Sequence, residues 1–257
     1  MKYLIPLTSL CLLSSLSALP INNPAAPQLT FKGLWMREDA FAGVKMGYEK
    51  ESVSNRGLFI QGEEPLKLNE ASFLKNLGTF TLNYLDRLEL YGSLGSIQGR
   101  LSYAPLFTPL LNLYELKSGW VAGCGGRLLL SQWGNCVLGM DGKAEWINPH
   151  VNLAIQAGSP LKESYAFHAF EWQTSLALSY TANFLTPYIG AKYSSMKGTL
   201  KALTSPINPQ DVLKLKSSHR LGMSIGFTLS PGSLFDITFE SQMIDEEGWL
   251  VGGQLKF

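Results

Sequence analysis

Two-residue alternation of side-chain polarity is the feature that most constrains this chain. Successive side chains of an extended strand point to opposite faces, so an apolar residue at every second position predicts a strand with one apolar and one polar face. In 220–229, for example, Met223 and Ile225 share the apolar face, while Ser224 and Gly226 share the other. No segment shows a long helical period, and the chain is therefore predicted to be all-β. The clearest alternating segments are 170–180, 220–229, 234–244 and 249–257.

The composition favours a membrane barrel over a soluble sandwich. Only 16% of the residues are charged, against about 25% in a typical soluble domain, and 25 glycines keep the non-apolar faces small. Several strands reach about 14 residues, whereas about 9–11 tilted residues cross a bilayer. A slip of one residue would turn Asp236 and Glu240 toward lipid, where a charge at the midplane costs up to about 2–4 kcal/mol. We therefore expect an antiparallel transmembrane β-barrel of the bacterial outer membrane, with lipid as a partner.

The charge balance excludes another class of partner. Lys and Arg together number 21 and Asp and Glu number 20, which leaves no broad basic surface for nucleic acid. We expect no nucleic-acid partner.

Apart from the N-terminus, no apolar run reaches the roughly 18 residues that a membrane-spanning helix needs.

The N-terminus has the layout of a secretory signal peptide. Lys2 precedes the almost wholly apolar run Tyr3–Leu13, and small residues follow it, as in a cleaved export signal. We predict a signal peptide over 1–18 with cleavage after Ala18, and Ser17 is the alternative. The following LPINNPAAP contains three prolines, which exclude a helix and predict an extended Pro-rich lead-in over 19–28. The barrel is assigned to 29–257.

Turn residues give an independent estimate of the strand number. Outer-membrane barrels have an even number of strands, short periplasmic turns and long external loops. Five predicted tight turns alternate in order with six other links, which predicts about twelve strands, within a range of about ten to sixteen. All the long loops then lie at one end. The tight turns are expected near Ser52, Leu85–Asp86, Gln132–Trp133, Asn183–Phe184 and Pro231–Gly232, and the links at Arg37–Ala40, Glu63–Lys75, Tyr103–Lys117, Asn148–His168, Gly198–Leu213 and Asp245–Glu247.

No candidate catalytic or metal site has the pattern that its chemistry requires. The sequence 222–226 matches G-x-S-x-G, but a nucleophile elbow needs a strand–turn–helix context, and Ser224 lies within an alternating strand. His150, His168 and His219 have neither metal-ligand nor triad spacing. We therefore expect no enzyme, no cofactor and no metal, and a hydrolase using Ser224 or a histidine is kept as an alternative. Cys124 and Cys136 are predicted not to face each other, and a cross-link from either to a neighbouring chain stays open.

The inward face of the predicted barrel carries charges of both signs. Opposed rows of charge in a barrel wider than eight strands favour a polar channel for small hydrophilic solutes, and mixed signs leave the charge selectivity open. A lumen packed with salt bridges is the alternative. Six glycines on the inner face (123, 125, 139, 190, 222 and 226) favour space over filling. By alternation the lumen residues are Lys45, Glu49, Arg87, Glu89, Arg100, Arg127, Asp141, Lys143, Glu145, Glu171, Lys192, Arg220, Asp236 and Glu240.

Several stretches resemble the chlamydial major outer membrane protein family of porins. The stretch 19–27 followed by Gly33-Leu34-Trp35 resembles the mature N-terminus of that family, and 83–95, 171–194 and 243–257 resemble family segments in the same order. The most specific part is Thr186-Pro187-Tyr188-Ile189-Gly190. The resemblance implies an outer-membrane porin that passes small hydrophilic solutes and ions, contributes to envelope integrity and forms a homotrimer. Phe257 ends a last strand that suits recognition by the barrel-assembly machinery.

This chain departs from the family in length and in cysteine content. It is shorter than typical members, and after removal of the signal it keeps two cysteines, where the family uses many in cross-linked envelope networks. These departures bear on the disulfide network and on the trimer that the resemblance implies. A non-conducting structural or adhesive barrel, with the long loops as contact surfaces, is the main alternative to a porin.

Overall fold

The computed structural model describes residues 20–30, 42–62, 66–104, 111–156, 159–160, 165–202, 212–232 and 234–257. The predicted signal peptide, with its cleavage after Ala18, lies outside these residues. A short 3-10 helix, Ala26–Thr30, precedes fourteen strands. They are β1 (Ala42–Arg56), β2 (Leu58–Ile60), β3 (Leu66–Lys67), β4 (Glu70–Tyr84), β5 (Leu88–Tyr103), β6 (Asn112–Trp133), β7 (Cys136–Gln156), β8 (Ser159–Pro160), β9 (Tyr165–Tyr180), β10 (Leu185–Ala202), β11 (Val212–Ser217), β12 (Leu221–Leu229), β13 (Phe235–Met243) and β14 (Glu246–Lys256).

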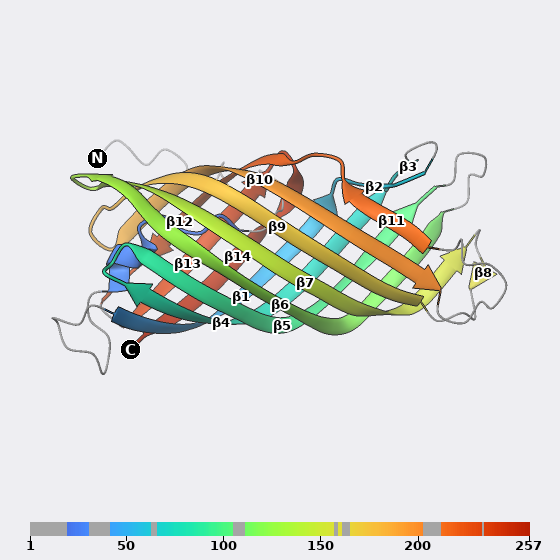
Figure 1. The fold of residues 1–257 in the computed structure, drawn as a ribbon, viewed down its shortest axis with the longest axis horizontal. Helices are drawn as coiled ribbons and strands as arrows, with labels where there is room; N and C mark the ends of the chain where they lie inside the picture. Colours follow the sequence, from blue (N-terminus) through green and yellow to red (C-terminus); the bar gives the residue numbers. More distant parts are fainter. Residues whose placement is uncertain are drawn as a thin grey trace, which may run out of the picture.

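Ten of these strands close into an antiparallel barrel. The order around the wall is β12-β13-β14-β1-β4-β5-β6-β7-β9-β10, and β10 pairs with β12 to complete the circle. The predicted antiparallel barrel is thus confirmed, and ten strands lie within the expected range of ten to sixteen, two below the expected twelve. Figure 1 shows the strands running obliquely along a cylinder, with the C-terminus at its left end.

The barrel narrows toward the end that carries the long links. The β13–β14 hairpin turns at Ile244, partway up the wall. Beyond it, β2 continues the line of β1 and β11 continues the line of β12, so that Leu58 pairs with Ser217 and Phe59 with Lys216. The wall therefore has two strands fewer at this loop end, which lies on the right in Figure 1, than at the opposite turn end.

The turns explain the difference in strand number. The chain reverses at Leu85–Asp86 and at Asn183 with positive φ angles, as tight hairpins require. The predicted turn near Ser52 is wrong, because β1 runs through this residue and pairs it with Leu74 and Trp249 on both sides. The other tight turns lie within two residues of their predicted positions, at Gly134 and near Pro231–Gly232.

The polarity of the wall inverts along the barrel axis. From the turn end upward, the outward face exposes large apolar side chains, as a lipid-facing surface requires. Above this apolar band the outward residues are polar, and the interior holds an apolar core that includes Phe73, Leu101 and Phe167. Aromatic residues border the band at both edges, where the bilayer interface favours them. The loop-side belt contains Tyr48, Trp120, Trp146, Phe170, Trp172 and Trp249, and the turn-side belt contains Tyr84, Trp133, Tyr180, Phe184 and Phe235.

No helix in the described part of the chain is long and apolar enough to cross a membrane.

Candidate functional site: the charged lumen

Most of the charged residues predicted to face inward are buried inside the barrel. Their side chains are at most 6% exposed, and several make contacts between strands that are not neighbours in the wall, which only an inward direction allows. These side chains therefore point into the barrel interior, and their role as the lining of a conducting pore stays a prediction. They are Lys45, Glu49, Glu89, Arg127, Asp141, Lys143, Glu145, Glu171, Lys192, Asp236 and Glu240.

Three of the predicted lumen residues do not face the lumen. Arg87 belongs to the turn before β5 and is exposed there. Arg220 lies in the break between β11 and β12, where it is exposed and donates a hydrogen bond to the Tyr193 hydroxyl at 2.8 Å. Arg100 points outward from β5, and its side chain is 50% exposed.

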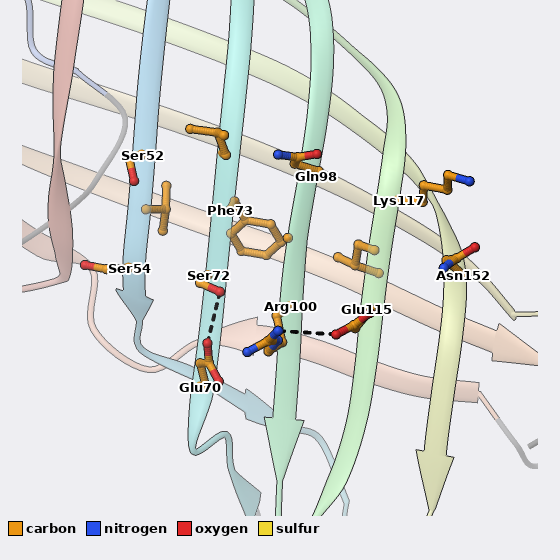
Figure 2. A pocket seen from close by; sticks show the side chains of 14 residues that line it. Ser52, Ser54, Glu70, Ser72, Phe73, Gln98, Arg100, Glu115, Lys117 and Asn152 are labelled. Carbon is orange, nitrogen blue, oxygen red and sulfur yellow. Dashed lines mark hydrogen bonds and ion pairs between the residues drawn. The ribbon is translucent and has the colours of Figure 1, made fainter. Parts of the chain in front are cut away.

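Arg100 lines an open hollow of about 620 Å³ on the outer wall. Figure 2 shows polar side chains from β1, β4, β5, β6 and β7 around this hollow, with Arg100 facing Glu115 and Ser72 facing Glu70. The Arg100–Glu115 pair spans 3.2 Å and is half exposed, so it contributes little stability. Because the hollow lies above the apolar band, its charges stay in water.

The middle of the lumen holds a network of buried ion pairs. Arg56 on β1 makes a bidentate pair with Glu171 on β9, and its Nε lies 3.0 Å from Glu246. Lys75 on β4 reaches Glu145 on β7 at 2.8 Å. The Arg56–Glu171 and Lys75–Glu145 contacts cross the barrel between non-adjacent strands, whereas Arg56 and Glu246 lie opposite each other on the paired strands β1 and β14. Removing one partner of such a pair leaves a buried charge and costs about 3–5 kcal/mol.

A second network fills the lumen nearer the turn end. Glu89 on β5 accepts from Lys45 at 2.6 Å and from Arg127 at 2.6 Å. Arg127 also lies 3.4 Å from Asp141, whose carboxylate accepts a hydrogen bond from the Tyr91 hydroxyl at 2.9 Å. Acids and bases alternate through this chain of contacts, so that each buried charge has a partner of opposite sign.

Alternation alone missed six charged lumen residues. Glu51 and Lys256 continue the inward rows of β1 and β14, and the same pattern could have found them. Lys75 falls in a segment that the sequence analysis assigned to a loop. Arg56 points inward because the register of β1 shifts between Val53 and Asn55. No residue pattern in the sequence predicts this shift. Asp245 and Glu246 form the tip of the β13–β14 hairpin, where both contact Lys192.

Residues 20–30 enter the lumen at the turn end. The backbone N–H groups of Ile21 and Asn22 donate to the Glu240 carboxylate at 2.8 and 2.9 Å. On the opposite side, Lys45 donates to the Ala26 carbonyl at 2.7 Å and Asn83 donates to the Pro27 carbonyl at 2.7 Å. The segment is therefore held by lumen side chains and not by strand pairing. It bends near Pro24 and forms the 3-10 helix, where the sequence predicts only an extended lead-in.

The space beside the inner glycines is occupied by other groups, so these glycines do not leave an open channel. A Cβ at Gly139 would lie 2.8 Å from Pro24, and one at Gly190 would lie 3.0 Å from Ile21. At Gly226 a Cβ would lie 2.5 Å from the Tyr188 ring. A cavity lined by Glu49, Tyr91 and other lumen residues has a volume of about 10 Å³, enough for about one water molecule. The side chains of the described residues therefore pack the lumen at these points.

The catalytic alternatives are not assembled. Ser224 is buried mid-strand on the inner face of β12, whereas His150 and His168 are exposed on the outer wall. Cys124 pairs in register with Ala144 and is unbridged, as is Cys136. Within the described residues no group of His, Cys, Asp and Glu is arranged to hold a metal ion.

A closed antiparallel barrel with an apolar outer band, aromatic belts and a charged interior is an outer-membrane β-barrel protein, and the protein belongs in the bacterial outer membrane.

Comparison with known proteins narrows this class. The sequence model described as Chlamydia major outer membrane protein matches residues 147–207. The major outer membrane porin of Chlamydia trachomatis serovar E is 23% identical over an alignment that covers 100% of this chain and 99% of the relative. The serovar A porin is 24% identical with the same coverage. The resemblance to the chlamydial major outer membrane protein family is thus confirmed. The serovar E alignment spans 394 positions, so about a third of them have no residue in this 257-residue chain.

Two solved structures are examples of those to which this chain is similar. The translocator domain of the autotransporter NalP from Neisseria meningitidis gives a TM-score of 0.43 at 10% identity and covers 91% of this chain and 92% of that one. The toluene transporter TbuX from Ralstonia pickettii gives a TM-score of 0.41 at 12% identity, with 91% of each chain covered.

Proposed function

We propose that this protein is an outer-membrane porin that passes small hydrophilic solutes and ions through its charged lumen. The observation that carries the proposal is the position of residues 20–30, which occupy the wide, ten-strand end of the barrel without pairing with any strand of the wall. If these residues leave, a polar entrance lined by charges of both signs is uncovered, as in a selective channel. The relatives that match over their full length are named porins.

Conduction also requires a change at the narrow end. There the interior is apolar and includes Phe73, Phe167 and Leu200. Apolar constrictions gate channels by excluding water, and they open when the side chains separate. The packed lumen of the described residues is therefore a resting state, with residues 20–30 as a plug at the wide end and an apolar gate at the narrow end.

Planar-bilayer recording of the refolded protein tests the proposal. We expect brief discrete conductance steps from the full mature chain and frequent steps from a variant that lacks residues 20–30. A heat-denatured sample of the same variant is the matched control and should be silent. Silence from both folded proteins at all voltages would reject the porin.

A non-conducting structural barrel is the second candidate. The packed lumen favours it, because buried ion pairs and the residual cavity of about 10 Å³ leave no path in the described state. Under this candidate the deletion variant folds, resists denaturation less than the full chain, and passes no current. The same recording therefore separates the two candidates.

Assembly in the envelope is part of the proposal. Phe257 directly follows β14, and its N–H donates to the Val44 carbonyl on β1 at 2.9 Å. We propose it as the signal for the barrel-assembly machinery. Phe257→Ala should lower the amount of folded protein in the outer membrane, whereas Leu255→Ala should lower it less. Chemical cross-linking in membranes tests the homotrimer that the family resemblance implies, and a single-chain band would contradict it.

A further inference from the structure

Lysines face one another across two strands on the outer wall at the narrow end. Lys197 on β10 lies directly opposite Lys216 on β11, and Thr199 lies opposite Lys214. Side chains at directly opposed positions have Cβ atoms about 5 Å apart, and like charges there destabilise the sheet. Lys201 follows on the same face of β10, and Arg220 lies just below, bonded to Tyr193.

The outward positions around this lysine cluster carry no carboxylate in the described strands. On β9 the outward residues beside Lys197 and Thr199 are Phe170 and His168. On β2 the residue opposite Lys216 is Phe59. On the other side of the barrel, by contrast, Arg100 and Glu115 form a balanced pair. The positive charge of β10 and β11 therefore lacks a protein counter-charge within these strands.

The lysine cluster lies directly above the loop-side aromatic belt. Phe170 of the belt is the register partner of Lys197, and it contacts Trp146 with ring centroids 5.4 Å apart. Aromatic belts mark the bilayer interface, so the lysines stand at the height of lipid headgroups. Because long loops face the outside in outer-membrane barrels, this interface belongs to the outer leaflet.

Below the cluster, an apolar strip continues down the same strands. Leu221 is 69% exposed, and Ile189, Leu176 and Ile225 are also exposed along β9, β10 and β12. A basic group above an apolar strip matches an amphiphile with an anionic head and acyl chains.

We propose that Lys197, Lys201, Lys214, Lys216 and Arg220 bind the phosphate groups of a phosphorylated glycolipid of the outer leaflet, with its acyl chains along the apolar strip. Phosphate oxygens between Lys197 and Lys216 would offset the repulsion of the opposed ammonium groups by charge-assisted hydrogen bonds. The site lies on the outer wall, so it serves in either state of the lumen and does not depend on conduction.

Binding of purified diphosphoryl lipid A to the folded protein in detergent tests the site, with native mass spectrometry as the measurement. K197Q/K216Q should weaken binding by about tenfold or more, because each lysine removed lowers the electrostatic attraction for the anionic head. The matched control K50Q/K117Q removes two outward lysines from other strands and should stay within about twofold of the wild type. K201Q/K214Q is an independent variant of the cluster and should weaken binding like K197Q/K216Q.

Two further ligands distinguish the source of the phosphate. Dephosphorylated lipid A should bind all proteins weakly, and inorganic phosphate at the same phosphate concentration should not displace the lipid. Equal loss in the cluster and control variants, equal binding of the dephosphorylated lipid, or full displacement by inorganic phosphate would each overturn the proposal. Unchanged heat-modifiable mobility of the variants shows that they remain folded.

Discussion

The carboxylate of Glu240, on the inner face of β13, accepts the backbone N–H of Ile21 at 2.8 Å, although 219 positions separate the two residues in the sequence. Its second oxygen accepts the N–H of Asn22 and the Tyr188 hydroxyl. One buried side chain thus satisfies two donors of a segment that has no strand partner. Together with Lys45 and Asn83, Glu240 holds the N-terminal segment inside the lumen.

Glu240→Ala is expected to release residues 20–30 from the lumen. Hydrogen bonds to a charged group contribute about 1.5–3 kcal/mol each, and two are lost here. With Ile21→Cys as the reporter and Cys124 and Cys136 replaced by serine, a membrane-impermeant maleimide should label the reporter at least about tenfold faster. Thr238→Ala, on the same strand, makes no such contact and should leave the rate unchanged. Equal labelling in both variants would contradict this role of Glu240.

Arg56→Met is expected to destabilise the barrel strongly. It removes the cation that contacts the buried carboxylate of Glu171 and leaves Glu246 with Lys192 alone, and breaking such a buried pair costs about 3–5 kcal/mol. The triple variant R56M/E171Q/E246Q removes the charges together and should recover most of that loss. Urea unfolding in lipid vesicles measures the difference. A triple variant as unstable as the single one would show that packing, and not charge, explains the effect.

Two arginine substitutions on β5 test the height of the membrane. Leu90 lies in the apolar band and is 54% exposed, whereas Gln98 lies on the same outward face beside the polar hollow. Leu90→Arg should lower the free energy of unfolding in vesicles by about 2–4 kcal/mol, the cost of a cation near the midplane. Gln98→Arg should change it by less than about 0.5 kcal/mol, as for an exposed surface site. Equal losses of unfolding free energy in the two variants would show that the apolar band does not end between Leu90 and Gln98.

Side-chain alternation predicts the faces of regular strands but not the consequences of bulges. In β12 and β13 the inward residues follow the two-residue period throughout, as Ser224 and Glu240 do. The prediction that Arg100 faces inward would hold only if β5 contained an extra residue before it. The pairing of β5 with β6 does shift register between Ile97 and Gly99, but the extra residue lies in β6. Arg100 therefore keeps its outward direction. Arg56 is the opposite case, because the shift in β1 turns it inward.

The lumen plug could not be predicted from the sequence. Prolines in 20–27 exclude regular structure and remove backbone donors, but the same pattern suits a solvated linker. Its burial depends on partners that are distant in sequence, such as Glu240, Lys45 and Gln173. Two of the six inner glycines that suggested open space, Gly139 and Gly190, are the positions against which Pro24 and Ile21 pack. A glycine in a strand can indicate that another group approaches the backbone closely, and it does not by itself indicate an empty volume.

The open channel is expected to prefer cations. Among the described lumen residues, the buried charged side chains comprise ten acids and seven bases, whereas the residues chosen from alternation alone were balanced. An excess of acidic groups along a pore favours cations. For the variant lacking residues 20–30, the reversal potential in a potassium chloride gradient should therefore show potassium to be more permeant than chloride. E49Q/E51Q/E240Q neutralises three inward acids and should remove most of this preference, whereas E70Q/E115Q/E247Q removes the same charge from the outer wall and should keep it. An anion-selective channel, or equal effects of the two triple variants, would show that these lumen charges do not face the conduction path.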